Sequence, residues 1–289
     1  MATSSSSNGN VNLGLNYLGI DDVLKRAALN SGVSPEKLQK DLPALRSEWG
    51  RQVFGGLVVL VRPDLNSTLL TDKDTGKLVV DEKGRYTITD TERIKESAAT
   101  IKELSDYGAK VIIMAHQGRL EDRDVISLEP HVRVLEDRLN QDGKTRNITF
   151  REHQWYGENT QERIKNMRRG EILALDNTRH LAADVYDRTG AVVNPLLFAN
   201  LPASFTRILG GLADYMVHDG FSVSHRWQGS IVGFPLIPNI AGRFMEEEIL
   251  TNRTMSNTPH PYTMVFGGVK IIDYLGLVKE SLDTGTVDN

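Results

Sequence analysis

Basic side chains recur in this sequence directly after its short apolar runs. Arg62 ends the run L-V-V-L-V-R, His116 follows A-K-V-I-I-M-A, and Arg179 comes shortly after I-L-A-L. His225 and Arg226 follow the run Y-M-V after seven further residues. A guanidinium group binds phosphate or carboxylate through paired hydrogen bonds. If these runs lie side by side, the side chains that follow them form a site for a small, strongly anionic ligand.

Other residues suited to anion binding follow the same runs. The segment Gly267-Gly268-Val269-Lys270 is too short to be a phosphate loop by itself, but it places a lysine and backbone N–H groups before a helix, where anions bind. Asp64 and Asn66 follow the first run. The complete set of candidate site residues is Asp64, Asn66, Arg93, His116, Arg119, Arg179, His225, Arg226, Gly267, Gly268 and Lys270.

Each of these side chains alone has an ordinary structural explanation. A single arginine after a strand is usually solvated or paired with a surface carboxylate, and such pairs contribute little. A single histidine more often has a structural role than a functional one. The repetition of basic side chains after successive apolar runs favours a binding site over a set of unrelated surface residues.

Several other kinds of site are excluded by the sequence. It contains no cysteine, so disulfides, thiolate metal sites and cysteine nucleophiles are absent. The motifs G-x-x-x-x-G-K-[ST], G-x-G-x-x-G, H-E-x-x-H and G-x-S-x-G do not occur. The seven histidines do not have the spacing of zinc ligands. No metal-binding residues are therefore predicted.

Composition and charge narrow the class of protein. The chain has 289 residues, of which 39% are hydrophobic and 25% charged, with a formal net charge of -4. A general nucleic-acid binder needs a basic excess, so none is expected. The apolar runs are too short to cross a bilayer, and the Ser- and Asn-rich start does not resemble a secretory signal. We expect a cytoplasmic protein without nucleic-acid or membrane partners.

From Gly56 onward, short β-branched runs alternate with amphipathic stretches. Strands are predicted over 57–62, 110–115, 148–150, 172–175, 215–217 and 262–266, a hairpin over 77–88, and helices over 90–107, 128–139, 159–167, 195–209, 241–252 and 271–282. Two more helices are predicted between Ile20 and Trp49, the second with Ser34 as its N-cap and Pro35 at its first position. This alternation is typical of βαβ units in a mostly parallel sheet, whose ligands bind beyond the carboxyl ends of the strands.

The motifs resemble, in the same order, those of phosphoglycerate kinases, and of archaeal members most of all. V-L-V-R-P-D-L-N is similar to the R-V-D-x-N strand end of that family, I-T-D-T-E-R-I to its T-D-x-x-R-I, and M-A-H-Q-G-R to its S-H-x-G-R. L-D-N-T-R resembles L-E-N-x-R, H-D-G-F-S-V-S-H-R resembles N-D-A-F-x-x-x-H-R, and F-G-G-V-K resembles G-G-x-K. The similarity runs from about Leu57 to Leu277.

The resemblance implies an α/β fold: a three-layer, Rossmann-like substrate domain with a parallel sheet, followed by the first βα unit of a similar nucleotide domain. It implies the glycolytic transfer of a phosphoryl group between 1,3-bisphosphoglycerate and ADP, which yields 3-phosphoglycerate and ATP with Mg²⁺. We therefore divide the chain into a disordered tail and helical extension (1–50), a phosphoglycerate-binding domain (51–240), an interdomain helix (241–256) and the start of a truncated nucleotide domain (257–289).

The resemblance also assigns roles to the candidate residues. Asp64 and Asn66 contact the glycerate, and the basic patch around its phosphate and carboxylate contains Arg93, His116, Arg119, Arg179 and Arg226, with His225 beside it. Gly267, Gly268 and Lys270 belong to the nucleotide side. Arg93 and Lys270 are the candidate catalytic residues, because phosphoryl transfer depends on positioning and charge neutralisation.

The chain also departs from the pattern of the family. Asp176 replaces the usual Glu, His218 the usual Asn, and Trp227 a smaller residue, while the later glycine-rich nucleotide loops are missing. The strand and helix expected within residues 262–282 cannot bury both faces of a sheet, so we expect that segment to be mobile or paired with another chain. Three alternatives stay open: half of a split enzyme, a non-catalytic binder of phosphoglycerate or another small anion, and a structural protein that assembles through a sheet edge.

Overall fold

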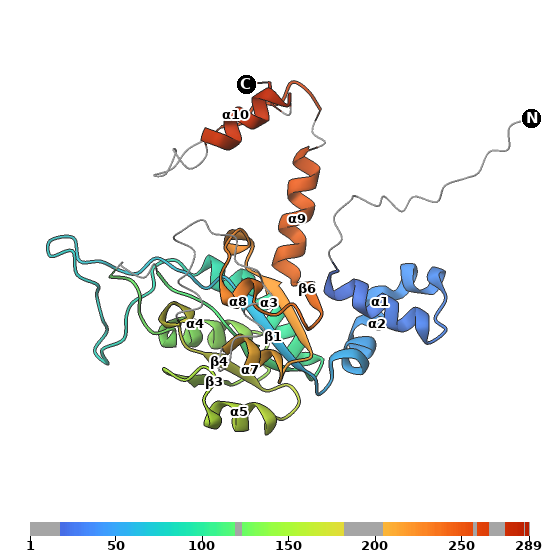
Figure 1. Ribbon diagram of the computed structural model, residues 1–289, viewed down its shortest axis with the longest axis horizontal. Coiled ribbons are helices and arrows are strands. Elements are labelled where there is room, and N and C mark those ends of the chain that lie inside the picture. The colour runs from blue at the N-terminus through green and yellow to red at the C-terminus, as the bar shows by residue number, and fades with distance from the viewer. Residues whose placement is uncertain are drawn as a thin grey trace, which may run out of the picture. The chain divides into compact units, whose positions relative to one another are not determined.

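A computed structural model describes residues 18–118, 123–181, 205–256, 259–265, 275–285 and 287–288. The chain divides into two compact units, Met1–Met245 and Glu246–Asn289. The first unit is built on a six-stranded sheet with the strand order β3-β4-β2-β1-β5-β6 (Figure 1). All neighbouring strands are parallel. The strands are β1 Val58–Pro63, β2 Lys110–Ile113, β3 Ile148–Arg151, β4 Ile172–Leu175, β5 Tyr215–Asp219 and β6 Asn239–Ala241.

Helices of the first unit cover both faces of its sheet. The helices of the described residues are α1 Ile20–Asn30, α2 Pro35–Phe54, α3 Glu92–Asp106, α4 Glu129–Leu139, α5 Glu158–Lys165, α7 Phe205–Gly210, α8 Gly229–Val232, α9 Arg243–Ser256 and, in the second unit, α10 Leu275–Asp283, with 3-10 turns η1 Thr178–His180 and η4 Phe221–Val223. None of the described helices combines the length and the apolar character that crossing a membrane requires.

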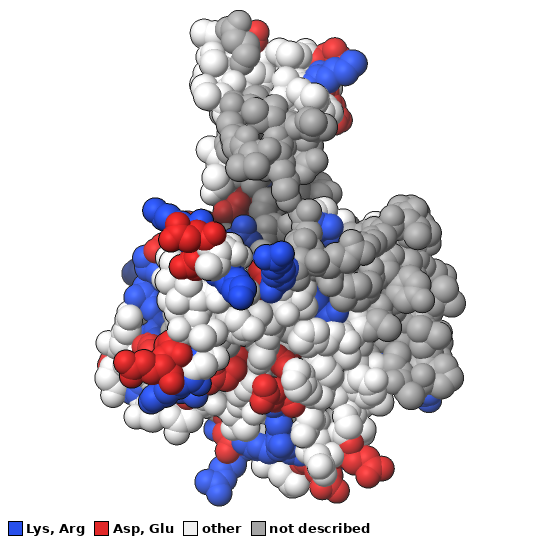
Figure 2. All heavy atoms as spheres, turned by 90° about the vertical axis from the view of Figure 1, so that its left-hand side faces the viewer, with Lys and Arg blue, Asp and Glu red and all other residues white. Residues whose placement is uncertain are grey.

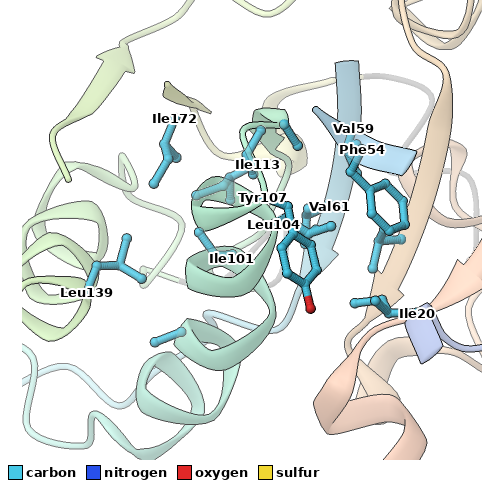
Figure 3. Close-up of a cluster of buried hydrophobic side chains, with 14 of the residues drawn as sticks. Ile20, Phe54, Val59, Val61, Ile101, Leu104, Tyr107, Ile113, Leu139 and Ile172 are labelled. Carbon is cyan, nitrogen blue, oxygen red and sulfur yellow. The ribbon is translucent and has the colours of Figure 1, made fainter. Parts of the chain in front are cut away.

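Alternate residues of each strand enter two separate apolar clusters, one on each face of the sheet. Val59 and Val61 pack with α1, α2, α3 and α4, whereas Val58 and Leu60 pack with α5 and α7. Figure 3 shows part of the first cluster, in which the rings of Phe54 and Tyr107 are stacked with centroids 6.2 Å apart. Both faces are covered, which explains why the strands are continuous apolar runs and confirms the three-layer α/β prediction.

The N-terminal extension is part of this core. Ile20, Leu24 and Ala28 of α1 are buried in the first cluster. Just before α1, Leu18 accepts a hydrogen bond from the backbone of Ala241 at 2.8 Å, and Gly19 forms a parallel bridge to the same residue of β6. Unpaired edge strands invite association, and this short added bridge covers part of the β6 edge.

A charged network joins α1, α3 and α9. Arg243 donates to both carboxylate oxygens of Glu103, at 2.6 and 2.7 Å, and to Asp21 at 2.8 Å. Asp21 also accepts two hydrogen bonds from Arg46 of α2. The start of α9 is also held by β5. Buried Asp219, at the end of β5, accepts hydrogen bonds from the backbone N–H groups of Phe244 and Met245.

Most predicted elements are present in the described residues, with two corrections. Residues 195–204 and 271–274 of two predicted helices lie outside the described residues. The residues predicted to begin a helix at Ala241 form β6 first, and the helix starts at Arg243. The strand predicted over Tyr262–Phe266 is absent from residues 259–265, the part of it that the structure describes. The predicted hairpin is confirmed as antiparallel bridges, including Val80 to Tyr86. Ser34 caps α2 by accepting from the backbone of Lys37 at 3.3 Å.

We predict that Arg243→Ala lowers the free energy of unfolding by about 3 kcal/mol, because it leaves the partly buried Glu103 without its charged partner. Arg46→Ala is the matched control, because its side chain is 41% exposed and its partner Asp21 keeps a second ion pair with Arg243. Its loss should be under about 1 kcal/mol. Urea denaturation followed by circular dichroism measures both values, and equal losses in the two variants would contradict the assigned role of Arg243.

Candidate functional site

The polar segments that follow β1, β2, β4 and β5 lie at one edge of the sheet. These four strands are parallel, and the order β4-β2-β1-β5 makes them consecutive neighbours. The chain leaves β1 to form β2 on one side and later returns to form β5 on the other. Ligands of open α/β sheets bind beyond the carboxyl ends of the strands at a reversal of this kind, and we call this edge of the sheet the crevice.

Side-chain amides tie the segments after β1, β2 and β4 together. The side chain of Asn177 accepts from the backbone N–H of Gln117 at 3.2 Å and donates to its carbonyl at 2.9 Å. Gln117 in turn bonds both backbone groups of Ser67, and Asn66 accepts from the N–H of Gly118 at 2.8 Å. These bonds are almost wholly buried, so they fix the edge before any ligand arrives.

Arg62 is almost fully buried at the carboxyl end of β1, with 1% of its surface exposed. It donates to the hydroxyl of Ser230 at 3.0 Å, and its terminal nitrogen lies 3.2 Å from Nδ1 of His116. A buried charge is costly unless it is hydrogen-bonded, and these contacts meet that condition. The position of Arg62 brings a permanent positive charge to the floor of the crevice.

Asp64 organises the next layer of the site. Its carboxylate accepts from Arg93 at 2.7 Å, from the hydroxyl of Ser222, and from the backbone of Asn66 at 3.0 Å. The Asp64 side chain is buried, while the Arg93 side chain is 49% exposed. Asp64 therefore holds one end of Arg93 and leaves much of this guanidinium at the surface of the crevice.

Four arginines act on a single imidazole at the centre of this edge. His116 is buried, and burial together with the charges of Arg62, Arg179, Arg93 and Arg226 holds its pKa well below the usual range. His116 is therefore neutral. Because Arg62 can only donate, Nδ1 of His116 is the acceptor and its proton resides on Nε2. The site thus offers a neutral N–H donor among cations, a combination suited to an anion.

The remaining predicted residues divide into three groups. Arg179 is buried and donates to the carbonyl of Gly118 at 3.2 Å, and Arg226 is half-buried after η4. His225 is exposed, and no hydrogen bond joins it to the other described residues of the crevice. The predicted residues Arg119, Gly267, Gly268 and Lys270 lie outside the described residues.

Sequence reasoning missed several side chains that build the site. Arg62 was visible as a charge at the end of an apolar strand, but nothing in the sequence showed that it is buried. The sequence also showed no sign of the roles of three polar residues, Gln117, Asn177 and Ser222. The hydrogen-bond partners of Asn177 and Ser222 lie more than 50 positions away along the chain. Only the strand order brings those partners together.

One face of the molecule carries side chains of both charges. On the face shown in Figure 2, the visible Lys and Arg side chains alternate with Asp and Glu over the described surface. A surface of this mixed kind does not attract a polyanion over a large area.

Comparison with known proteins places this geometry in a family. The sequence profile described as "Phosphoglycerate kinase" matches residues 53–288. Similar curated proteins, each named "Phosphoglycerate kinase", come from Methanothermus fervidus, 35% identical over 81% of this chain and 52% of its relative, and from Aeropyrum pernix, 35% identical over 80% and 52%. The chain spans about half the length of the curated relatives it matches.

Solved structures give the same result. The phosphoglycerate kinase of Pyrococcus horikoshii is 30% identical, with a TM-score of 0.68 over 81% of this chain and 52% of the other. The phosphoglycerate kinase of Coxiella burnetii, 22% identical with a TM-score of 0.53 over 80% of this chain and 50% of the other, shares the fold. The N-terminal extension precedes the residues that the family profile matches.

We predict that acid destabilises the protein through its buried neutral histidines. Burial lowers the pKa of His131, whose ring bonds the amide of Gln117, to about 4. The unfolded chain takes up this proton near pH 6.5 but the folded chain does not, so stability falls as the pH drops from 6.5 towards 4. Protonation of His131 in the unfolded chain accounts for a loss of about 2 kcal/mol in the free energy of unfolding between pH 6.5 and 5.

Urea denaturation at pH 7.5 and pH 5 measures this loss. His131→Gln should lose less stability on acidification than the unchanged protein, while the control His225→Gln, at an exposed position, should lose as much. An unchanged pH dependence in His131→Gln would show that His131 is not the group that resists protonation.

Proposed function

The chain belongs to the phosphoglycerate kinase family, and from that premise we propose that its cationic crevice binds 3-phosphoglycerate and 1,3-bisphosphoglycerate. The observation that carries this proposal is the convergence of Arg62, Arg93, Arg179 and Arg226 on the neutral His116. A phosphorylated three-carbon acid carries a phosphate and a carboxylate at its two ends, which suits several guanidinium groups in one crevice.

Each side chain has a proposed role in holding this ligand. Arg179 and Arg226 bind the phosphate through charge-assisted hydrogen bonds, and His116 donates its Nε2 proton to the same end of the ligand. Asp64 and Asn66 contact the glycerate hydroxyl and backbone. Arg119 and His225 complete the basic patch in this proposal, as the sequence motifs imply.

Arg93 is the proposed catalytic residue of the described crevice. The reaction moves a phosphoryl group between a carboxylate oxygen of the substrate and ADP, so negative charge accumulates on the transferring group. Asp64 holds the Arg93 guanidinium at 2.7 Å and fixes its orientation before the ligand binds. A fixed positive charge beside the reacting carboxylate stabilises the developing charge without a covalent nucleophile.

The nucleotide side of the reaction has less support. ADP or ATP with Mg²⁺ is implied by the family, and Gly267, Gly268 and Lys270 are the residues proposed for it. These three residues lie outside the described residues, and the one described lysine of the second unit, Lys279, pairs with Asp283. We therefore derive no step through Mg²⁺ or ATP from this chain. A second chain that completes the nucleotide site stays a proposal, as do the glycolytic role and the cytoplasmic location.

A second candidate function is a non-catalytic binder of phosphoglycerate or another small anion. It is favoured by the make-up of the crevice, because His116 and the four arginines that act on it all lie in the first unit. The two candidates share the first binding step and differ in the second. Only a kinase, complete or completed by a partner, responds to nucleotide.

We predict saturable binding of 3-phosphoglycerate by isothermal titration calorimetry, weakened about 10- to 100-fold in Arg179→Ala and in Arg226→Ala, because each loses charge-assisted hydrogen bonds. The matched control is Arg133→Ala on α4, an arginine that is 57% exposed and paired with Glu129. It should bind like the unchanged protein. Circular dichroism verifies that each variant is folded.

Repeating the titration with Mg²⁺ and ADP separates the two candidates. A change in 3-phosphoglycerate affinity, or turnover of ATP with 3-phosphoglycerate, supports the kinase. Binding that is indifferent to nucleotide supports the non-catalytic binder. The absence of binding at millimolar ligand in a folded sample contradicts both, and leaves a kinase-like scaffold without the proposed site.

A further inference from the structure

A second cluster of polar side chains lies beyond the carboxyl ends of β3 and β4, and the proposed function does not use it. His153, Asp176 and His180 each place one potential ligand atom so that all three atoms lie within 4.8 Å of one another. His153 follows β3, whereas Asp176 and His180 follow β4, so two neighbouring strands of the sheet position the cluster.

The carboxylate of this cluster is fixed from several sides. Asp176 is fully buried, and its Oδ1 accepts from the backbone N–H groups of Leu128 and Asn177 at 2.9 and 2.8 Å. Its Oδ2 accepts from the backbone of His153 at 3.1 Å and lies 3.2 Å from Nδ1 of the same residue. These hydrogen bonds fix the Asp176 carboxylate, with its Oδ2 atom near the two exposed imidazoles.

The backbone at His153 is strained in a way that serves this cluster. Its φ is 51°, in the left-handed region that side chains other than glycine rarely adopt. Such a conformation costs about 1 kcal/mol or more and is maintained only when the surroundings impose it. In this conformation its backbone N–H donates to Asp176 at 3.1 Å, and its imidazole lies beside the same carboxylate.

A pocket of about 620 Å³ opens next to these three residues. His153, His180 and Trp155 line it, and the indole N–H of Trp155 donates to the carbonyl of Asp176 at 2.9 Å. The two imidazole rings are 5.9 Å apart, and the indole lies 6.3 Å from the first and 6.1 Å from the second. An ion bound to the imidazoles would therefore be accessible from solvent.

The side-chain groups of the cluster indicate which metal ion it would bind. Two imidazoles and one carboxylate suit Zn²⁺ and similar transition metals, whereas Mg²⁺ and Ca²⁺ prefer oxygen ligands throughout. Zinc bonds of about 2.0–2.1 Å at tetrahedral angles place neighbouring ligands about 3.3 Å apart. The 3.2 Å separation between His153 Nδ1 and Asp176 Oδ2 matches that spacing, and rotation of the exposed His180 ring brings in the third ligand.

We propose that His153, Asp176 and His180 form a zinc site with a fourth position open to the adjacent pocket. The site is distinct from the anion-binding crevice, although the two share the turn η1. Within that turn Arg179 is buried and bonds Gly118, while the neighbouring His180 is exposed and lines the pocket. Zinc binding therefore does not depend on the proposed kinase function.

Calorimetric titration of the full chain with Zn²⁺, prepared without a histidine tag, tests the proposal. We expect one saturable site, weakened at least about tenfold in His153→Ala and in His180→Ala, since each loses a ligand. The control is His260→Ala, an exposed histidine that lies 2.7 Å from the carboxylate of Asp288 with no second imidazole in its ion pair. Binding of Co²⁺ should give visible absorption bands typical of a four-coordinate ion, which His180→Ala loses.

Two variants keep this proposal separate from the proposed function. Arg179→Ala should retain zinc binding while losing affinity for 3-phosphoglycerate, and His180→Ala should show the reverse. Zinc affinity that is equal in the unchanged protein, His153→Ala and His180→Ala would overturn the proposal, as would the absence of saturable zinc binding at 100-fold excess of the ion. Both His153 and His180 are exposed, so their replacement should not prevent folding.

Discussion

The repulsion among guanidinium groups at one sheet edge is the constraint on which the rest of this site depends. Arg62, Arg93, Arg179 and Arg226 act on one imidazole, and Asp64 is the carboxylate that contacts Arg93 within the crevice. Such a cluster is tolerated because buried amides and backbone groups hold each segment in place and because His116 gives up its proton. In the proposed function, an anionic ligand adds negative charge beside these guanidinium groups.

The fold was largely predictable because its signals are local. Continuous apolar runs such as the one before Arg62 indicate buried parallel strands, and the Ser34-Pro35 pair indicates a helix start. The strand β6 escaped prediction because Asn239–Ala241 has three residues and leads directly into a helix. The strand expected at Tyr262–Phe266 rested on the same apolar pattern, but residues 259–265 have no neighbouring strand in the described structure to pair with.

The residue types of the candidate site were predictable from the sequence, but the burial and protonation of its side chains were not. Strand ends rich in Arg and His pointed to an anion, yet burial of Arg62 and the tautomer of His116 follow from packing that no short motif encodes. The cluster of His153, Asp176 and His180 escaped for a different reason: it joins residues from two strands, and their sequence spacing matches no metal motif. The N-terminal extension, outside the family match, is held by core packing and by the network around Arg243.

The crevice is a cationic site with a neutral histidine, His116, at its centre. NMR of the protein with ¹⁵N-labelled histidine measures the protonation of both ring nitrogens of His116 directly. We expect a neutral ring with its proton on Nε2 at pH 6, and signals that shift when 3-phosphoglycerate is added. A doubly protonated His116 at pH 6, or signals that do not respond to saturating 3-phosphoglycerate, would contradict it.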